Sequence, residues 1–64
     1  MTVADLLPYD GKQVKILFND NRPYRVGKLR YFGGRFELLV KQGCICRLHL
    51  LNALETIDTV TVVE

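Results

Sequence analysis

Short stretches of this chain alternate apolar and polar residues with a period of two. One alternation runs from Lys12 to Asn19, and another runs from Phe36 to Lys41. The apolar positions are Val14, Ile16 and Phe18 in the first stretch and Phe36, Leu38 and Val40 in the other. A period of two is typical of strands with one buried face. The two stretches therefore predict two half-buried strands.

Three further stretches complete a predicted set of five strands. The stretch from Tyr24 to Phe32 alternates less cleanly, which we attribute to a bulge or bend at Gly27. Cys44 to Leu51 is apolar on both faces, a pattern typical of a strand that is central or covered by a partner. Leu54 to Val63 supplies the fifth strand, with a break expected near Asp58.

Turn-forming residues separate these strands. They are Asp10-Gly11, Asn19-Asp20-Asn21, Gly33-Gly34 and Gln42-Gly43. Near the start, Thr2 and Asp5 have the spacing of a capping box, and Pro8 limits the following helix to about one and a half turns. We therefore predict an all-β fold: a small, five-stranded, strongly bent antiparallel barrel of the SH3 type with a short N-terminal helix. Residues 1–64 would form a single domain.

Charge is distributed unevenly along the chain. The window from residue 21 to residue 35 contains no acid and five cations, which are Arg22, Arg25, Lys28, Arg30 and Arg35. Residues 48–64 contain three acids and no Lys or Arg. The formal net charge of +2 therefore conceals a basic segment and an acidic one.

Aromatic residues are interleaved with these cations, which suits phosphate contacts combined with base stacking. The predicted nucleic-acid-binding residues are Arg22, Tyr24, Arg25, Lys28, Arg30, Tyr31 and Arg35. The alternative is that Tyr31 and Phe32 belong to the core, while the cations solvate a sheet edge and discourage aggregation.

Catalytic and metal-binding patterns are not found in the sequence. His49 is the only histidine and has apolar neighbours, so we interpret it as structural or solvent-facing. The carboxylates are dispersed, and Cys44 and Cys46 with one histidine fall short of a zinc site. We expect two half-buried reduced thiols, no cofactor, no metal and no enzymatic activity.

The chain contains no apolar run of the length of a membrane span, and its first residues lack the basic flank of a signal peptide. We expect a cytoplasmic protein without a membrane partner. A core this small stabilises a chain marginally, so we expect the protein to associate with copies of itself.

At the level of motifs the chain resembles the Sm-like family of small bent barrels, which includes the Sm, LSm and Hfq proteins. The matching segments are Val14–Phe18, Asn19–Asn21, Gly27-Lys28-Leu29, Phe32, Phe36–Val40 and Leu50–Ile57. The resemblance implies RNA binding, a barrel with a short N-terminal helix, and homo-oligomeric rings that form when the fourth strand of one subunit pairs with the fifth of the next. In this chain those strands lie around Cys44–Leu51 and Leu54–Val63.

The ligand positions of the family match less well. Gly33 and Glu37 stand where Sm proteins usually have Asp and Asn, and Leu50-Leu51-Asn52 stands where Hfq has Tyr-Lys-His. An acidic residue repels phosphate, and leucine cannot replace a cation or an imidazole donor. These departures argue against the uridine pocket of the family.

The chain also resembles, in shorter segments, the Rof family of Sm-like inhibitors of the transcription terminator Rho, which exist without rings. The segments are Phe36–Val40, Arg47–Leu50 and Ile57–Val63. Two functions therefore compete: a non-enzymatic module that binds RNA or single-stranded nucleic acid, and a protein-interaction module such as a Rof-like regulator.

Overall fold

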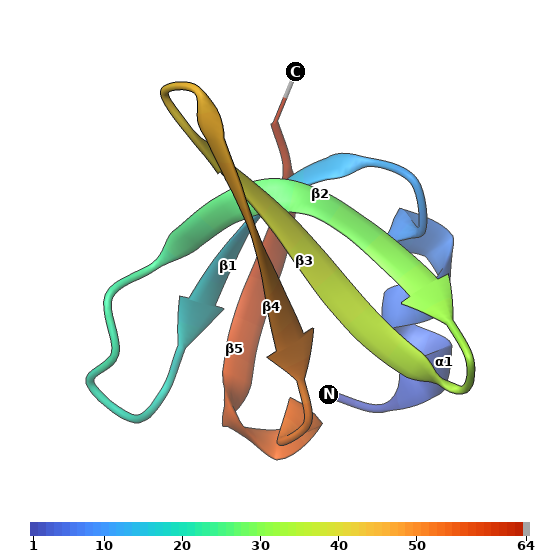
Figure 1. Cartoon of the computed structure of the whole chain (residues 1–64). Helices are drawn as coiled ribbons and strands as arrows, with labels where there is room; N and C mark the ends of the chain where they lie inside the picture. Colours follow the sequence, from blue (N-terminus) through green and yellow to red (C-terminus); the bar gives the residue numbers. More distant parts are fainter. Residues whose placement is uncertain (64) are drawn as a thin grey trace.

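The computed structural model describes residues 1–63 and shows five antiparallel strands preceded by a short helix (Figure 1). The elements are α1 (Val3–Leu6), the 3-10 turn η1 (Leu7–Tyr9), β1 (Gln13–Phe18), β2 (Arg25–Phe32), β3 (Arg35–Gln42), β4 (Ile45–Leu51), the 3-10 turn η2 (Leu54–Thr56) and β5 (Ile57–Val62). The strands form one open sheet in the order β4-β3-β2-β1-β5. This confirms a small, mostly-β fold with a short N-terminal helix.

The core lies on one side of this sheet, here called the inner face, and the opposite side is the outer face. Its buried side chains are Leu6, Val14, Ile16, Leu29, Phe36, Leu38, Val40 and Ile57. Register places Leu29 beside Leu38, and the period of two predicted for β1 and β3 is observed on both strands. The alternation in the sequence therefore predicted the buried face correctly.

Gly27 is the point at which β2 changes partners. Residues 25–28 pair with β1, whereas residues 28–32 pair with β3. A Cβ atom at Gly27 would overlap the carbonyl oxygen of Leu39 and lie 2.9 Å from its carbonyl carbon. Only glycine permits this approach of two backbones, and β2 curves visibly along its length (Figure 1).

The helix starts with the predicted capping box. The backbone N–H of Asp5 donates to the Thr2 hydroxyl at 3.3 Å, and the Thr2 N–H donates to the Asp5 carboxylate at 2.9 Å. The hydrogen bonds that the Thr2 N–H and the Thr2 hydroxyl donate to this carboxylate lower the pKa of Asp5. The helix is only four residues long, and it inserts Leu6 into the core.

β4 differs most from its sequence-based description. It is an edge strand with most of its residues exposed, and the β3–β4 hairpin projects from the body of the protein (Figure 1). The apolar residues on both faces of β4 therefore do not reflect a central position in the sheet. Cys44, in the turn, and Cys46, on the strand, are both exposed free thiols rather than half-buried ones.

The fifth strand is shorter than predicted. Residues 54–56 form η2, and β5 begins only at Ile57. The Thr56 hydroxyl donates to the Ala53 carbonyl at 2.7 Å, a local bond that competes with extended backbone. The irregularity expected near Asp58 is a register shift between Leu17 and Phe18, opposite residues 57–59.

No helix in the described part of the chain has the length and apolarity needed to cross a membrane.

Candidate nucleic-acid interface

Three of the seven predicted binding residues share the outer face of β2 and β3. Lys28 and Arg30 alternate with inward-facing Leu29, and Arg35 lies opposite Phe32 at the β2–β3 turn. All three cations are exposed. This group therefore forms a positive surface on the outer face of the β2–β3 hairpin.

Two additional lysines extend this surface. The outer face of β1 to β3 carries five cations, Lys15, Lys28, Arg30, Arg35 and Lys41, and one carboxylate, Glu37. Glu37 lies opposite Arg30 in the register, but the two side chains form no ion pair. The one ion pair found within residues 1–63 joins Asp20 to Arg22. The positive charge of this face is therefore largely uncompensated.

Two aromatic rings are exposed beside these cations. Phe32 is 65% exposed and Tyr24 is 57% exposed. The ammonium group of Lys15 lies 4.3 Å from the centre of the Tyr24 ring. One alternative from the sequence placed Phe32 in the core, but it is the most exposed aromatic side chain of the described residues. Phe32 directly follows inward-facing Tyr31 on β2, so its side chain points to the other face. This alternation could have revealed that Phe32 is exposed.

Arg22 is occupied by local contacts. Its Nε donates to the Asp20 carboxylate at 2.9 Å, and its Nη2 donates to the Thr56 hydroxyl at 2.6 Å. The guanidinium also lies over the Phe18 ring, 4.2 Å from its centre. The hydrogen bond from Arg22 lowers the pKa of Asp20. Arg22 therefore fixes the loop before β2 against η2.

Arg25 and Tyr31 lie on the inner side. The Tyr31 ring packs against buried Phe36 with 4.8 Å between ring centres. Arg25 Nη1 lies 3.1 Å from Nε2 of half-buried His49. Since arginine only donates, Nε2 accepts and the ring hydrogen resides on Nδ1. The seven predicted residues are therefore divided among the outer face, a loop and the inner face.

His49 and Arg47 are inner-face residues outside the predicted binding set. Register places His49 beside Leu38 and Arg47 beside Val40. Burial first, and then the charges of Arg25 and Arg47, lower the pKa of His49. The sequence did contain a signal that these two residues lie together. Arg47 and His49 are two positions apart, a spacing that places both side chains on one face of a strand.

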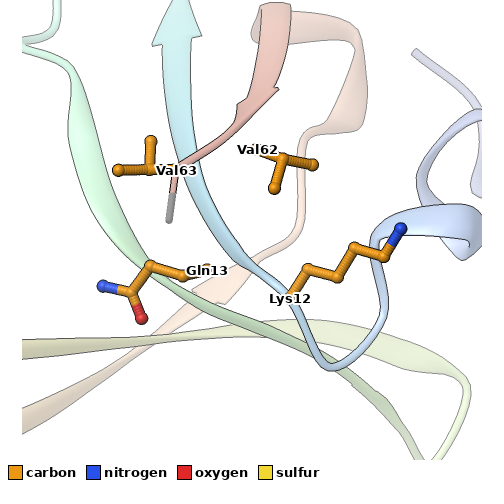
Figure 2. Close-up of a pocket in the computed structure, with 4 residues that line it drawn as sticks. All are labelled: Lys12, Gln13, Val62 and Val63. Atoms are coloured by element: carbon orange, nitrogen blue, oxygen red, sulfur yellow. The ribbon is translucent and has the colours of Figure 1, made fainter.

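Two other features carry no comparable chemistry. A shallow pocket between β1 and β5 is lined by Lys12, Gln13, Val62 and Val63, and Figure 2 shows Lys12 and Gln13 pointing apart beneath the two valines. Within residues 1–63 no three His, Cys, Asp or Glu side chains are grouped as metal ligands would be.

Comparison of the chain with protein-family models, curated proteins and solved structures finds no match.

Proposed function

We propose that this protein is a non-enzymatic module that binds RNA or single-stranded DNA on the outer face of β1 to β3. The observation that supports this function best is the combination of five cations, one carboxylate and two exposed aromatic rings on that face. Phosphates attract cations without regard to sequence, and unpaired bases stack on exposed rings. Low sequence specificity follows.

In this proposal Lys28, Arg30 and Arg35 contact successive phosphates of a strand that crosses β2 and β3. Phe32 lies between these cations in the register and supplies the stacking platform. Tyr24, beside Lys15, supplies a second platform. The proposed interface does not include Arg22, Arg25 or Tyr31. Their side chains contact Asp20, His49 and Phe36, respectively, away from the outer face. Single strands are favoured because paired bases cannot stack on a protein ring.

Replacing Lys28 and Arg30 together by glutamine tests the proposal. We expect affinity for a labelled oligonucleotide to fall at least about tenfold, and the slope of log affinity against log salt to decrease by about 1.4, from two lost phosphate contacts. Fluorescence anisotropy at several salt concentrations measures both quantities. Lys12→Gln removes an exposed cation that precedes β1 and is not one of the five outer-face cations, and it serves as the control. An affinity insensitive to salt, or an equal loss in the control, contradicts the proposal.

We also propose that the bent sheet is a barrel of the Sm-like type. The strand order, the short helix before β1 and the position of Leu6 in the core are consistent with such a barrel. β4 and β5 are the two free edges of the sheet. Self-association through these edges would give each of them backbone partners.

A protein-interaction module is the second candidate function, and exposed β4 favours it. Ile45 is 59% exposed, Leu48 is 53% exposed and Leu50 is 46% exposed on this edge strand. An edge with unpaired backbone groups and apolar side chains can accept a strand from another chain. A Rof-like contact with a regulatory protein partner is one form of this candidate.

Leu48→Lys tests association through β4. The substitution places a charge in the middle of the edge strand, and we expect it to reduce any oligomer of the protein to a monomer in size-exclusion chromatography with light scattering. Leu17→Lys is the control, because Leu17 is also exposed but lies on β1, in the interior of the sheet. A wild-type protein that is monomeric at about 100 µM would exclude strong self-association and leave a different protein as the partner.

A further inference from the structure

A second group of basic residues lies on the inner face and is separate from the outer surface. It consists of Arg25, Arg47 and His49, here called the inner cluster. Arg25 precedes the bend at Gly27, and its part of β2 pairs only with β1. Even so, its guanidinium reaches His49 on β4, which is two strands away from β2 in the sheet. The bend of β2 therefore brings Arg25 over the inner face of β4.

Arg47 belongs to the same cluster. It is two residues from His49 on β4 and shares its face. Both arginines act on the His49 ring, since their charges add to burial in lowering its pKa. Arg25 thus contacts a neutral imidazole, and Arg47 lies two residues from that imidazole on the same face of β4.

Nothing in the described chain balances this charge. The single ion pair within residues 1–63 joins Asp20 to Arg22, so neither Arg25 nor Arg47 has a carboxylate partner. The inner-face neighbours on β3, Leu38 and Val40, are apolar, as are Ile57 and Val60 on β5. Two like charges beside a half-buried imidazole repel one another, and an anion between them would relieve that repulsion.

We propose that the inner cluster binds a tetrahedral oxyanion, a phosphate or sulfate group. The two planar guanidinium groups supply paired N–H donors that match the oxygens of such an anion. His49 then takes up a proton from solvent at Nε2, which ends its acceptance of the Arg25 hydrogen bond and adds a third donor. Binding and protonation of His49 strengthen each other by thermodynamic linkage. This site is independent of nucleic-acid binding by the outer face.

Sulfate is the first probe, because its charge is constant across the titration range of histidine. His49 is the only histidine of the chain, so its imidazole gives unambiguous NMR signals. We expect sulfate, compared with chloride at equal ionic strength, to raise the His49 pKa and to bind about tenfold more tightly near pH 5 than near pH 8. A titration curve of His49 that is identical in sulfate and in chloride overturns the proposal.

Matched variants separate the site from general charge effects. Arg47→Gln is expected to weaken sulfate binding about fivefold or more, whereas Lys41→Gln is expected to change it less than about twofold. Lys41 pairs with Cys46 and lies on the outer face of the same two strands, so both variants lose one charge from exposed positions. His49→Gln keeps a hydrogen-bond acceptor for Arg25 and is expected to abolish the pH dependence of binding. Equal losses in the Arg47 and Lys41 variants overturn the proposal.

The source of the anion is resolved by a second comparison, which uses inorganic phosphate and a trinucleotide with or without a 5′-phosphate. Tighter binding of the 5′-phosphorylated trinucleotide than of both the unphosphorylated trinucleotide and inorganic phosphate identifies the end of a nucleic-acid strand as the ligand. Binding of inorganic phosphate with no gain from the trinucleotide identifies a free ion. Either result supports the oxyanion site, and the absence of both overturns it. Because the outer-face variant Lys28→Gln/Arg30→Gln retains the inner cluster, failure of the two proposals can be distinguished.

Discussion

Gly27→Ala is expected to abolish the cooperative folding of this protein or to lower its Tm by about 15 °C. The new methyl group would overlap the carbonyl group of Leu39, and backbone atoms cannot rotate away as a side chain can. The cost is about 3 kcal/mol. A domain of this size has a total stability of only about 3–5 kcal/mol. Thermal unfolding followed by circular dichroism measures the change.

Gly34→Asn is the control for this prediction. Gly34 has a φ of 79° in the β2–β3 turn, and a Cβ there meets no atom within 4 Å. Asparagine tolerates left-handed backbone angles, so we expect a Tm within about 5 °C of the wild type. If Gly27→Ala is as stable as Gly34→Asn, then β2 and β3 do not approach as closely as described.

Phe36→Ala is expected to destabilise the protein by about 3–5 kcal/mol, which is comparable with its whole stability. Phe36 is 1% exposed and is the largest side chain of the core. Its removal leaves a cavity beside Leu29 and Leu38 and deprives Tyr31 of its ring contact. Urea unfolding measures the loss, and a stability within about 1 kcal/mol of the wild type would contradict this core.

Phe32→Ala is the informative partner of that substitution, because it changes the same residue type on the same hairpin. Phe32 lies on the outer face and is largely exposed, so the stability should change by less than about 0.5 kcal/mol. Oligonucleotide affinity should nevertheless fall about tenfold, since one stacked base contributes about 1–3 kcal/mol. Normal stability with unchanged affinity would remove Phe32 from the proposed interface.

The two proposed sites assign different tasks to cations that are neighbours in the sequence. Lys28 and Arg30 face outward, where phosphates of a long ligand are accessible. Arg25, only three residues before Lys28, faces inward and contacts His49. Replacing Arg25 and Arg30 together by glutamate would therefore perturb two surfaces at once, and variants confined to one face are required to separate their roles.

The local sequence was sufficient to predict most of the fold. Alternation identified the buried residues Val14, Ile16, Phe36 and Leu38, because a strand places every second side chain on one face. Turn residues located the hairpins, and Asn21, Gly33, Gly34 and Gly43 all have positive φ angles. The role of Gly27 as a bend was also visible, because an isolated glycine within a strand marks a close backbone approach.

The candidate site was less predictable, because proximity in sequence does not determine the face of a strand or the partners of a side chain. The basic window contained the outer-face cations Lys28, Arg30 and Arg35, and the alternation of β2 and β3 separates them from Tyr31. The contacts of Arg22 with Thr56 cross 34 positions in the chain, so no local pattern reveals them. The exposure of β4 likewise depends on strand order rather than on its own composition.

By itself, the sequence determined the number of strands, the buried side of most of them and the glycine that bends β2, because these depend on periods and turn geometry within a few residues. Only the tertiary structure decided that Arg25 and Arg47 meet at His49 while Lys28 and Arg30 face away. The physical reason is that the bend at Gly27 brings β2 over β4, two strands that are neighbours neither in the sequence nor in the sheet.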